Sequence, residues 1–215
     1  MIRVLKAEFV ASAAALTQAP LADRLEVAFV GRSNVGKSSM MNALCARKKL
    51  VRVSNTPGRT RLLNFFDVLL EVSGQHRELR LCDLPGYGYA KVSKSERSGW
   101  DTMIREYLEN RTTLRVVVAL VDAEIGLTPD DERTLDYLLG STHRILLVAT
   151  KLDRLPKAKR KPVLWGLAEK LGISKEAVLG FSATDKIGVV ETWESLVGVL
   201  FPRAAGAKDA NGVHV

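Results

Sequence analysis

Eight consecutive residues, 31–38, combine two glycines, a lysine and a hydroxyl group at a spacing that suits phosphate chemistry. They read Gly-Arg-Ser-Asn-Val-Gly-Lys-Ser and fit G-x-x-x-x-G-K-[ST] at every fixed position. The glycines permit a tight loop whose N–H groups face an anion, and a following helix adds partial positive charge. Lys37 can reach the β- and γ-phosphates of a nucleotide, and the Ser38 hydroxyl can bind Mg²⁺. The alternative is a solvated lysine in a chance match, but an apolar strand precedes the loop and a helix follows it.

Asp83-Leu84-Pro85-Gly86 ends another strand-like run and has the pattern D-x-x-G. An aspartate at the end of a strand can hold Mg²⁺ through water, and the Gly86 N–H can contact a γ-phosphate. Read alone, D-x-x-G often marks a plain turn. At this distance after a phosphate loop, the pattern predicts that Asp83 and Gly86 belong to the same site.

A second direct Mg²⁺ ligand is expected from residues 50–62, between the first helix and the next strand. This segment contains Thr56 and Thr60, and either hydroxyl offers the oxygen ligand that Mg²⁺ prefers. A plain turn around Pro57-Gly58 is the alternative. Composition does not decide between the two threonines.

Thr150-Lys151-Leu152-Asp153 follows an apolar run and fits the pattern [NT]-K-x-D. The Asp153 carboxylate can accept hydrogen bonds from N1–H and the 2-amino group of guanine together, and adenine lacks that pair of donors. Each hydrogen bond to a charged group is worth ~1.5–3 kcal/mol. The Lys151 stem can lie across the base, and the Ala183 N–H can bond the guanine O6. Alone, the tetrapeptide would be a helix cap, but its register with the other motifs predicts a guanine site.

Strand-like apolar runs alternate with amphipathic stretches, which predicts a mostly parallel sheet with helices on both faces. Ligands then bind at the carboxyl ends of the strands. The expected strands are 25–30, 63–72, 78–82, 114–121, 144–149 and 178–181, and the expected helices are 38–47, 96–110, one opening at Pro129 with Thr128 as N-cap, 157–171 and 187–200.

Local signals refine three of these elements. Strands 63–72 and 78–82 flank Ser73-Gly74-Gln75, which predicts an antiparallel hairpin. Pro162 inside helix 157–171 implies a kink or a later start, and Gly172 is its expected end. We find no internal repeat and no second core. The simplest organisation is one domain over residues 24–201, with an N-terminal extension (1–23) and a disordered tail (202–215).

Composition narrows the class of protein. A chain of 215 residues that is 47% hydrophobic can bury one full core. Cys45 and Cys82 lie within apolar patterns and are expected to be buried free thiols, which fits a reducing cytoplasm. The absence of an apolar run of about 18 residues argues against a membrane span. The N-terminus superficially resembles a signal peptide, but Lys6 and Glu8 interrupt its apolar stretch, so we expect a cytoplasmic protein.

The net charge of +8 and pI near 9.6 favour anionic partners, of which RNA is the obvious candidate. The alternative is that the charge only aids solubility, and charge alone leaves both open. Basic residues cluster in segments 91–97 and 157–161, and the segment before the second expected strand adds Arg47, Lys48, Lys49 and Arg52.

With these motifs in place, the chain resembles the TRAFAC-class GTPases of the Era-, EngA- and TrmE-like group. Within that class it resembles the EngB (YihA or YsxC) ribosome-biogenesis GTPases of bacteria, from about Ala7 to the final helix. A generic small GTPase would share the phosphate loop, D-x-x-G and T-K-x-D, but not the run from Gly86 to Val92. The resemblance rests on Ala7-Glu8-Phe9, 26–30 (EVAFV), 31–39 (GRSNVGKSS), Pro57-Gly58-Arg59-Thr60, Asn64-Phe65-Phe66 and 83–100 (DLPGYGYAKVSKSERSGW).

The resemblance implies a three-layer P-loop GTPase fold of the α/β class, with a mostly parallel six-stranded sheet and one antiparallel edge strand. It implies that Thr60 joins Ser38 and Asp83 around Mg²⁺, and that Lys37, Thr60 and Gly86 act in hydrolysis. The family usually has Gln directly after that threonine, and Arg61 stands there instead. The expected nucleotide contacts are Gly31, Arg32, Ser33, Asn34, Val35, Gly36, Lys37, Ser38, Gly58, Arg59, Thr60, Arg61, Leu62, Asp83, Leu84, Pro85, Gly86, Thr150, Lys151, Leu152, Asp153, Phe181, Ser182, Ala183 and Thr184.

Two positions bear on the rate of hydrolysis. Ras-like GTPases orient the attacking water with a Gln just after D-x-x-G, and here that position is Tyr87. We therefore expect slow intrinsic turnover and activation by a partner that orders the switch loops. Asn34 suggests a second hypothesis, because in related GTPases an Asn at this position can bind K⁺. We prefer the simpler interpretation that Asn34 only shapes the loop.

The resemblance implies a monomeric switch that binds the large ribosomal subunit and its rRNA during assembly, with a link to normal cell division and septation. The alternative is a GTPase switch with a cell-division or other protein partner and no RNA contact. A metabolic P-loop kinase is a third possibility, against which the guanine motif and the lack of a candidate acceptor-binding domain argue.

Overall fold

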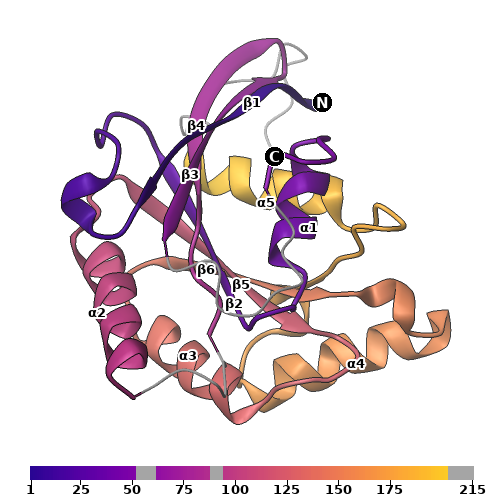
Figure 1. Ribbon diagram of the computed structural model, residues 1–215. Helices are drawn as coiled ribbons and strands as arrows, with labels where there is room; N and C mark the ends of the chain where they lie inside the picture. The colour runs from indigo at the N-terminus through magenta and orange to yellow at the C-terminus, as the bar shows by residue number, and fades with distance from the viewer. Residues whose placement is uncertain (52–61, 88–93, 203–215) are drawn as a thin grey trace.

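The amino-acid sequence folds into a central sheet with helices on both faces, shown in the computed structural model of Figure 1. The structure describes residues 1–51, 62–87 and 94–202, with the backbone alone for 94–101. The strands are β1 (Ile2–Ala13), β2 (Glu26–Gly31), β3 (Leu63–Val72), β4 (Gln75–Asp83), β5 (Leu114–Asp122), β6 (Arg144–Thr150) and β7 (Val178–Gly180). The helices are α1 (Lys37–Leu44), α2 (Lys94–Asn110), α3 (Pro129–Leu139), α4 (Lys157–Lys170) and α5 (Val189–Leu200).

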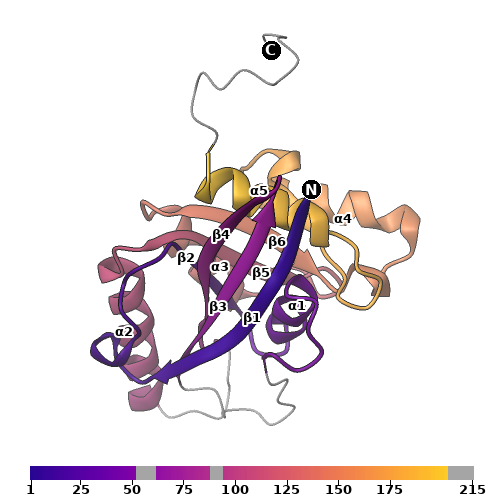
Figure 2. The same cartoon turned by 90° about the horizontal axis from the view of Figure 1, so that it is seen from above.

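The strand order is β1-β3-β4-β2-β5-β6-β7, and all pairs from β4 to β7 are parallel. β3 runs antiparallel to both of its neighbours, β1 and β4. The predicted α/β class and mostly parallel sheet are thus confirmed. The predicted number of strands was wrong, because the sheet formed by the described residues has seven strands rather than six. The antiparallel strand is also not at the edge, since β1 lies outside it (Figure 2).

The segment that we expected to be an N-terminal extension supplies this edge strand. Two register shifts, between Val4 and Lys6 and between Phe9 and Ala11, interrupt its pairing with β3. Such irregularities destroy the alternation by which a strand is recognised in sequence. Most β1 side chains are also exposed or half-buried, so no apolar face marks the strand.

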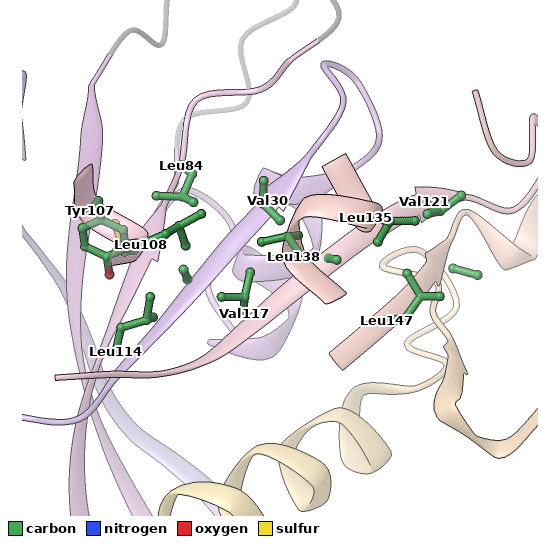
Figure 3. Close-up of a cluster of buried hydrophobic side chains, with 14 of the residues drawn as sticks. Val30, Leu84, Tyr107, Leu108, Leu114, Val117, Val121, Leu135, Leu138 and Leu147 are labelled. Atoms are coloured by element: carbon green, nitrogen blue, oxygen red, sulfur yellow. The ribbon is translucent and has the colours of Figure 1, made fainter. Parts of the chain in front are cut away.

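Two apolar layers sandwich the sheet. α2, α3 and α4 cover one face and α1 and α5 cover the other (Figure 1). The sequence of β5 is almost wholly apolar because both faces of the strand are covered. Val117 and Val121 face the first layer, whereas Val118 and Leu120 face the second. Figure 3 shows side chains of the first layer, with Leu135 and Leu138 of α3 lying over the strands.

Local signals explain several ends of elements. The hairpin between β3 and β4 turns on Ser73 and Gly74 alone, both with positive φ (48° and 81°), as a two-residue turn requires. Thr128 caps α3 in a capping box, as predicted. α4 begins at Lys157 with Pro162 inside it, so the predicted alternative of a later start is wrong. Gly172 ends the helix with φ 64°, as predicted.

Cys45 and Cys82 are free and buried, as predicted. Burial raises the pKa of the Cys45 thiol to about 12, so it stays protonated at neutral pH. Among the described helices, none is long and apolar enough to cross a membrane. The expected tail falls almost wholly on residues 203–215, which lie outside the described part.

A buried ion pair ties the N-terminal segment to the domain. Glu26, which is fully buried at the start of β2, accepts hydrogen bonds from Arg111 Nη2 (2.5 Å) and from the Tyr107 hydroxyl (2.9 Å). Arg111 Nη2 also donates to the Pro20 carbonyl (2.7 Å), just before β2. Arg111, which directly follows α2, therefore links that helix to β2 and to the segment between β1 and β2.

We predict that Arg111→Ala destabilises the protein by roughly 3–5 kcal/mol, because it leaves a buried carboxylate without its principal partner. Urea unfolding followed by circular dichroism measures the change. Arg133→Ala is the matched control, since Arg133 pairs with Asp130 on the exposed face of α3 and exposed pairs contribute little. Equal unfolding midpoints for the two variants would contradict the prediction.

Candidate functional site

The phosphate loop lies between the end of β2 and the start of α1, as predicted. Gly31 ends the strand where the backbone passes close to its neighbours: a Cβ there would lie 2.8 Å from Val35 Cγ1 and 3.2 Å from the Leu120 carbonyl oxygen. Gly36 caps α1 with φ 104°, a left-handed conformation that glycine adopts without strain. Both fixed glycines of the pattern are thus required by the geometry of the turn.

Asn34 also has a positive φ, 62°, and is exposed. Asparagine tolerates the left-handed region better than most residues. This conformation supports the interpretation that Asn34 shapes the loop.

Lys37 and Asp83 form an ion pair although both are buried, with exposed fractions of 9% and 3%. β2 and β4 are parallel neighbours in which Phe29 lies opposite Asp83, so the strands end side by side. The structure therefore brings together the lysine predicted to bind phosphates and the aspartate predicted to hold Mg²⁺.

The D-x-x-G segment lies against the phosphate loop. The Ser33 N–H donates to the Tyr87 carbonyl (3.0 Å), and Arg32 and Tyr87 form an isolated parallel bridge. A Cβ at Gly86 would lie 3.2 Å from both the backbone nitrogen and the Cα of Ser33. Gly86 is therefore in close contact with the loop, as expected of a residue of the same site.

The Tyr87 side chain points to α3, where its hydroxyl donates to Asp131 Oδ1 (2.8 Å). Burial raises the pKa of Tyr87 above its usual range, and the negative charge of Asp131 raises it further. Asp131 is itself 1% exposed and accepts from the Thr128 N–H and hydroxyl. The sequence analysis identified the cap at Thr128 but missed Asp131, although the spacing of Thr128 and Asp131 is that of a capping box.

The predicted guanine motif, residues 150–153, is hydrogen-bonded to the phosphate loop. The Thr150 hydroxyl donates to the Val35 carbonyl (2.5 Å) and lies 3.1 Å from the Val121 carbonyl. Lys151 has φ 58°, and its Nζ lies 2.7 Å from Asp122 Oδ2 at the end of β5. Asp122 was not predicted, although an acidic residue that ends a buried strand is the same signal that identified Asp83.

Ser182 orients the predicted base-reading carboxylate. It is fully buried, and its hydroxyl donates to Asp153 Oδ1 (2.6 Å). The Leu152 N–H bonds the Phe181 carbonyl (3.0 Å), so the two segments that follow β6 and β7 are joined by backbone and side chain. Ala183 is half-buried and Thr184 exposed beside them.

Other predicted residues are placed only in part. Leu84 and Pro85 are buried, and Leu62 is exposed just before β3. Thr56, Gly58, Arg59, Thr60 and Arg61 lie outside the described residues, as do Arg52 and residues 91–93.

The donor set suits Mg²⁺ bound together with a nucleotide. Within residues 1–51, 62–87 and 94–202, no group of three or more His, Cys, Asp or Glu side chains forms a metal cluster. Mg²⁺ usually keeps several waters and binds through one or two carboxylates plus substrate phosphates. Asp83, in contact with Lys37, and Ser38, the residue after Lys37, offer one carboxylate and one hydroxyl at the loop.

Comparison with known proteins agrees with this site. Residues 26–151 match the family described as 50S ribosome-binding GTPase. A Myxococcus xanthus protein named "Probable GTP-binding protein EngB" is 56% identical over 197 residues, which cover 92% of this chain and 96% of the relative. A protein of the same name from Anaeromyxobacter dehalogenans is 44% identical over 209 residues, which cover 96% of this chain and 97% of the relative.

Solved structures share the fold. The crystal structure of a probable GTP-binding protein engB is similar with a TM-score of 0.62 and 24% identity, covering 83% of this chain and all of that chain. Aquifex aeolicus Era bound to GDP and AlF4⁻ is similar with a TM-score of 0.67 and 22% identity, covering 83% of this chain and 57% of Era. The family match, the two EngB relatives and the arrangement of the phosphate loop, D-x-x-G and T-K-x-D agree: the chain belongs to the EngB family of GTP-binding proteins, within the ribosome-binding GTPases.

Proposed function

We propose that this protein is a guanine-nucleotide switch that hydrolyses GTP slowly and acts in assembly of the large ribosomal subunit. The observation that carries the proposal is the meeting of four segments at the carboxyl ends of neighbouring strands. They are the phosphate loop at β2, D-x-x-G at β4, T-K-x-D at β6 and residues 181–184 after β7. The Thr150–Val35 hydrogen bond sets the spacing between the phosphate loop and the base-reading segment. A nucleotide laid along this edge would place its phosphates on residues 31–38 and its base beside Asp153.

Asp153 and Lys151 are the groups that we assign to guanine. Ser182 fixes one carboxylate oxygen of Asp153, which leaves the carboxylate pre-oriented to accept from N1–H and the 2-amino group. Asp122 holds the Lys151 ammonium, so the apolar stem of that lysine is available to lie across the base. Thr184 and the Ala183 N–H complete this end of the site.

Mg²⁺ would be held by Ser38, Thr60 and Asp83, and when bound it neutralises phosphate charge. In the presence of a nucleotide Lys37 is expected to bind the β- and γ-phosphates. Gly86 would sense the γ-phosphate through its N–H. These roles assign Lys37, Thr60 and Gly86 to hydrolysis.

Slow hydrolysis follows from the direction of Tyr87. Its hydroxyl is bonded to Asp131 of α3, and a phenol in that position does not orient a water in line with the γ-phosphate as a Gln does. Activation is then expected from a partner that orders the switch loops.

We predict that the isolated protein hydrolyses GTP in single-turnover assays at about 10⁻⁴ s⁻¹, the order of unassisted Ras. This rate corresponds to a barrier of roughly 23 kcal/mol. Because Asn34 has the left-handed conformation that shapes the loop, we expect equal rates in K⁺ and Na⁺; faster turnover in K⁺ would instead assign Asn34 as a K⁺ ligand. A rate above ~1 s⁻¹ in either salt would contradict slow intrinsic hydrolysis.

The partner surface that we propose lies on α4 and the turn after it. We define the α4 surface as Lys157, Lys159, Lys161, Trp165 and Lys175, all of them exposed. Lys175 Nζ lies 5.1 Å from the centre of the Trp165 ring, and Trp165 is 46% exposed. Among the described side chains, none of these lysines has an acidic partner within 4.0 Å. Uncompensated positive charge beside an exposed aromatic ring is typical of RNA-binding surfaces.

We predict that the protein co-sediments with large ribosomal subunits more strongly with a non-hydrolysable GTP analogue than with GDP, and that added salt weakens the binding. Lys159→Glu with Lys161→Glu should weaken it and reduce the salt slope by about 1 for each phosphate contact removed. The control, Arg115→Glu with Arg144→Glu, changes net charge equally at exposed positions near the opposite ends of the strands.

Salt-independent pelleting, or equal loss of binding in the two double variants, would contradict an rRNA contact through α4. Salt-independent binding would favour the alternative, a GTPase switch with a cell-division or other protein partner.

A further inference from the structure

Trp165 lies exposed on α4, whereas Trp193 on α5 is buried. The exposed fraction of Trp165 is 46% and that of Trp193 is 4%, and the Trp193 indole N–H donates to the Leu44 carbonyl (3.0 Å). The residue after Trp165 is Gly166, at which a Cβ would meet nothing within 4 Å. Open space therefore adjoins the exposed indole, and a flat group can approach it.

The side chains that flank this ring are cationic. Lys175 Nζ lies 5.1 Å from the ring centre. Lys157 and Lys161 precede Trp165 by eight and four residues on the same helix. Residues four apart are neighbours on a helix surface, so the two lysines and the ring form a row along one side of α4. All of these side chains are exposed.

Two acidic side chains adjoin this row without cancelling its charge. Glu169 follows Trp165 by one turn, and Glu176 follows Lys175. The Ser174 hydroxyl donates to the Glu176 carboxylate, so this acid is bonded within its own turn. The lysines of the α4 surface outnumber the two acids, and the surface therefore attracts an anion.

A ring beside several ammonium groups fits one kind of anionic partner in particular. A nucleotide carries an anionic phosphate and a flat base, and aromatic side chains stack on such bases. The indole can stack only on a base whose face is not already covered, and inside a duplex the neighbouring bases cover both faces. The lysines alone would suit any RNA backbone, but the ring suits unpaired nucleotides.

We propose that Trp165 stacks on an unpaired base of RNA and so directs the α4 surface to a single-stranded segment. The Lys175 ammonium lies near the ring as a cation does in a cation–π contact. When a base takes its place, the flexible stem of Lys175 lets the ammonium reach a phosphate of the same strand. The inference rests on the rRNA contact proposed above, and it adds the kind of RNA structure that is recognised.

The test compares a short single-stranded RNA with the same RNA annealed to its complement, each carrying a fluorescent label. Fluorescence anisotropy with the full chain measures both dissociation constants, and tryptophan emission is recorded in the same titrations. We expect the wild-type protein to bind the single strand more tightly than the duplex. The single strand should also quench tryptophan emission, and this quenching should be absent in Trp165→Phe.

Trp165→Ala should weaken binding of the single strand roughly five- to 150-fold, the effect of losing one stacked base. It should leave duplex binding within about twofold of wild type. The salt dependence should not change, because stacking releases no counterions, whereas Lys161→Gln should reduce it. Trp165→Phe keeps an aromatic ring and should retain most of the affinity for the single strand.

Phe9→Ala is the matched control, because Phe9 is another exposed aromatic residue (53%) and lies on β1. β1 is at the opposite edge of the sheet from β7, next to which Leu164 of α4 packs. The control should leave both dissociation constants unchanged, and thermal unfolding shows that each variant is folded.

Equal affinity of the wild-type protein for single strand and duplex, or unchanged binding of the single strand by Trp165→Ala, would overturn the inference. So would a Trp165→Ala protein that loses ribosomal subunits but keeps the single strand, since that result indicates a protein partner. Expected RNA binding without co-sedimentation of subunits would contradict the proposed function alone. Co-sedimentation with no preference for single strands would contradict this inference alone.

Discussion

The placement of a buried lysine beside a buried aspartate is the constraint on which the site depends. Removing two charges from water is costly unless each finds a partner, and Lys37 and Asp83 are partners for one another. Their contact requires that β2 and β4 be adjacent and parallel and that α1 begin one tight turn after β2. The apolar strands and the two helical layers satisfy these requirements.

The same pair explains how the fold is suited to its ligand. In the function that we propose, Lys37 binds phosphate oxygens and Asp83 holds a hydrated cation, and the two groups face each other in a buried site. Around them the phosphate loop and the guanine motif form one fixed unit through Thr150 and Val35. Gly86 and Tyr87 touch this unit through main-chain contacts, and the Tyr87 hydroxyl donates to the Asp131 carboxylate on α3.

Much of the site could be predicted from sequence because its chemistry restricts the residue types at fixed spacing. The glycines at 31 and 36 are needed by the turn, and Asp83 and Asp153 are needed by their expected ligands. Asp122 and Asp131 were missed because their roles depend on Lys151 and Tyr87, which are distant in sequence. Thr150 was predicted as part of the base site, but its bond to Val35 requires that β6 end beside the phosphate loop.

The fold was predicted where burial leaves a pattern. β5 is buried on both faces and was recognised, whereas β1 has irregular pairing and exposed side chains and was missed. As a result the sheet was expected to be one strand smaller, with its antiparallel strand at the edge. α4 runs from Lys157 through Pro162, although a proline inside a helical pattern alone favours a kink or a later start.

The central claim is that Asp153 reads a guanine base. Titration calorimetry of GDP binding to Asp153→Asn tests it most directly, with Asp185→Asn, an exposed carboxylate on the neighbouring loop, as control. The account predicts that Asp153→Asn weakens GDP binding by at least roughly tenfold, because it removes charge-assisted hydrogen bonds worth ~1.5–3 kcal/mol each, while thermal unfolding and the control stay near wild type. Unchanged GDP affinity in a folded Asp153→Asn protein would contradict it.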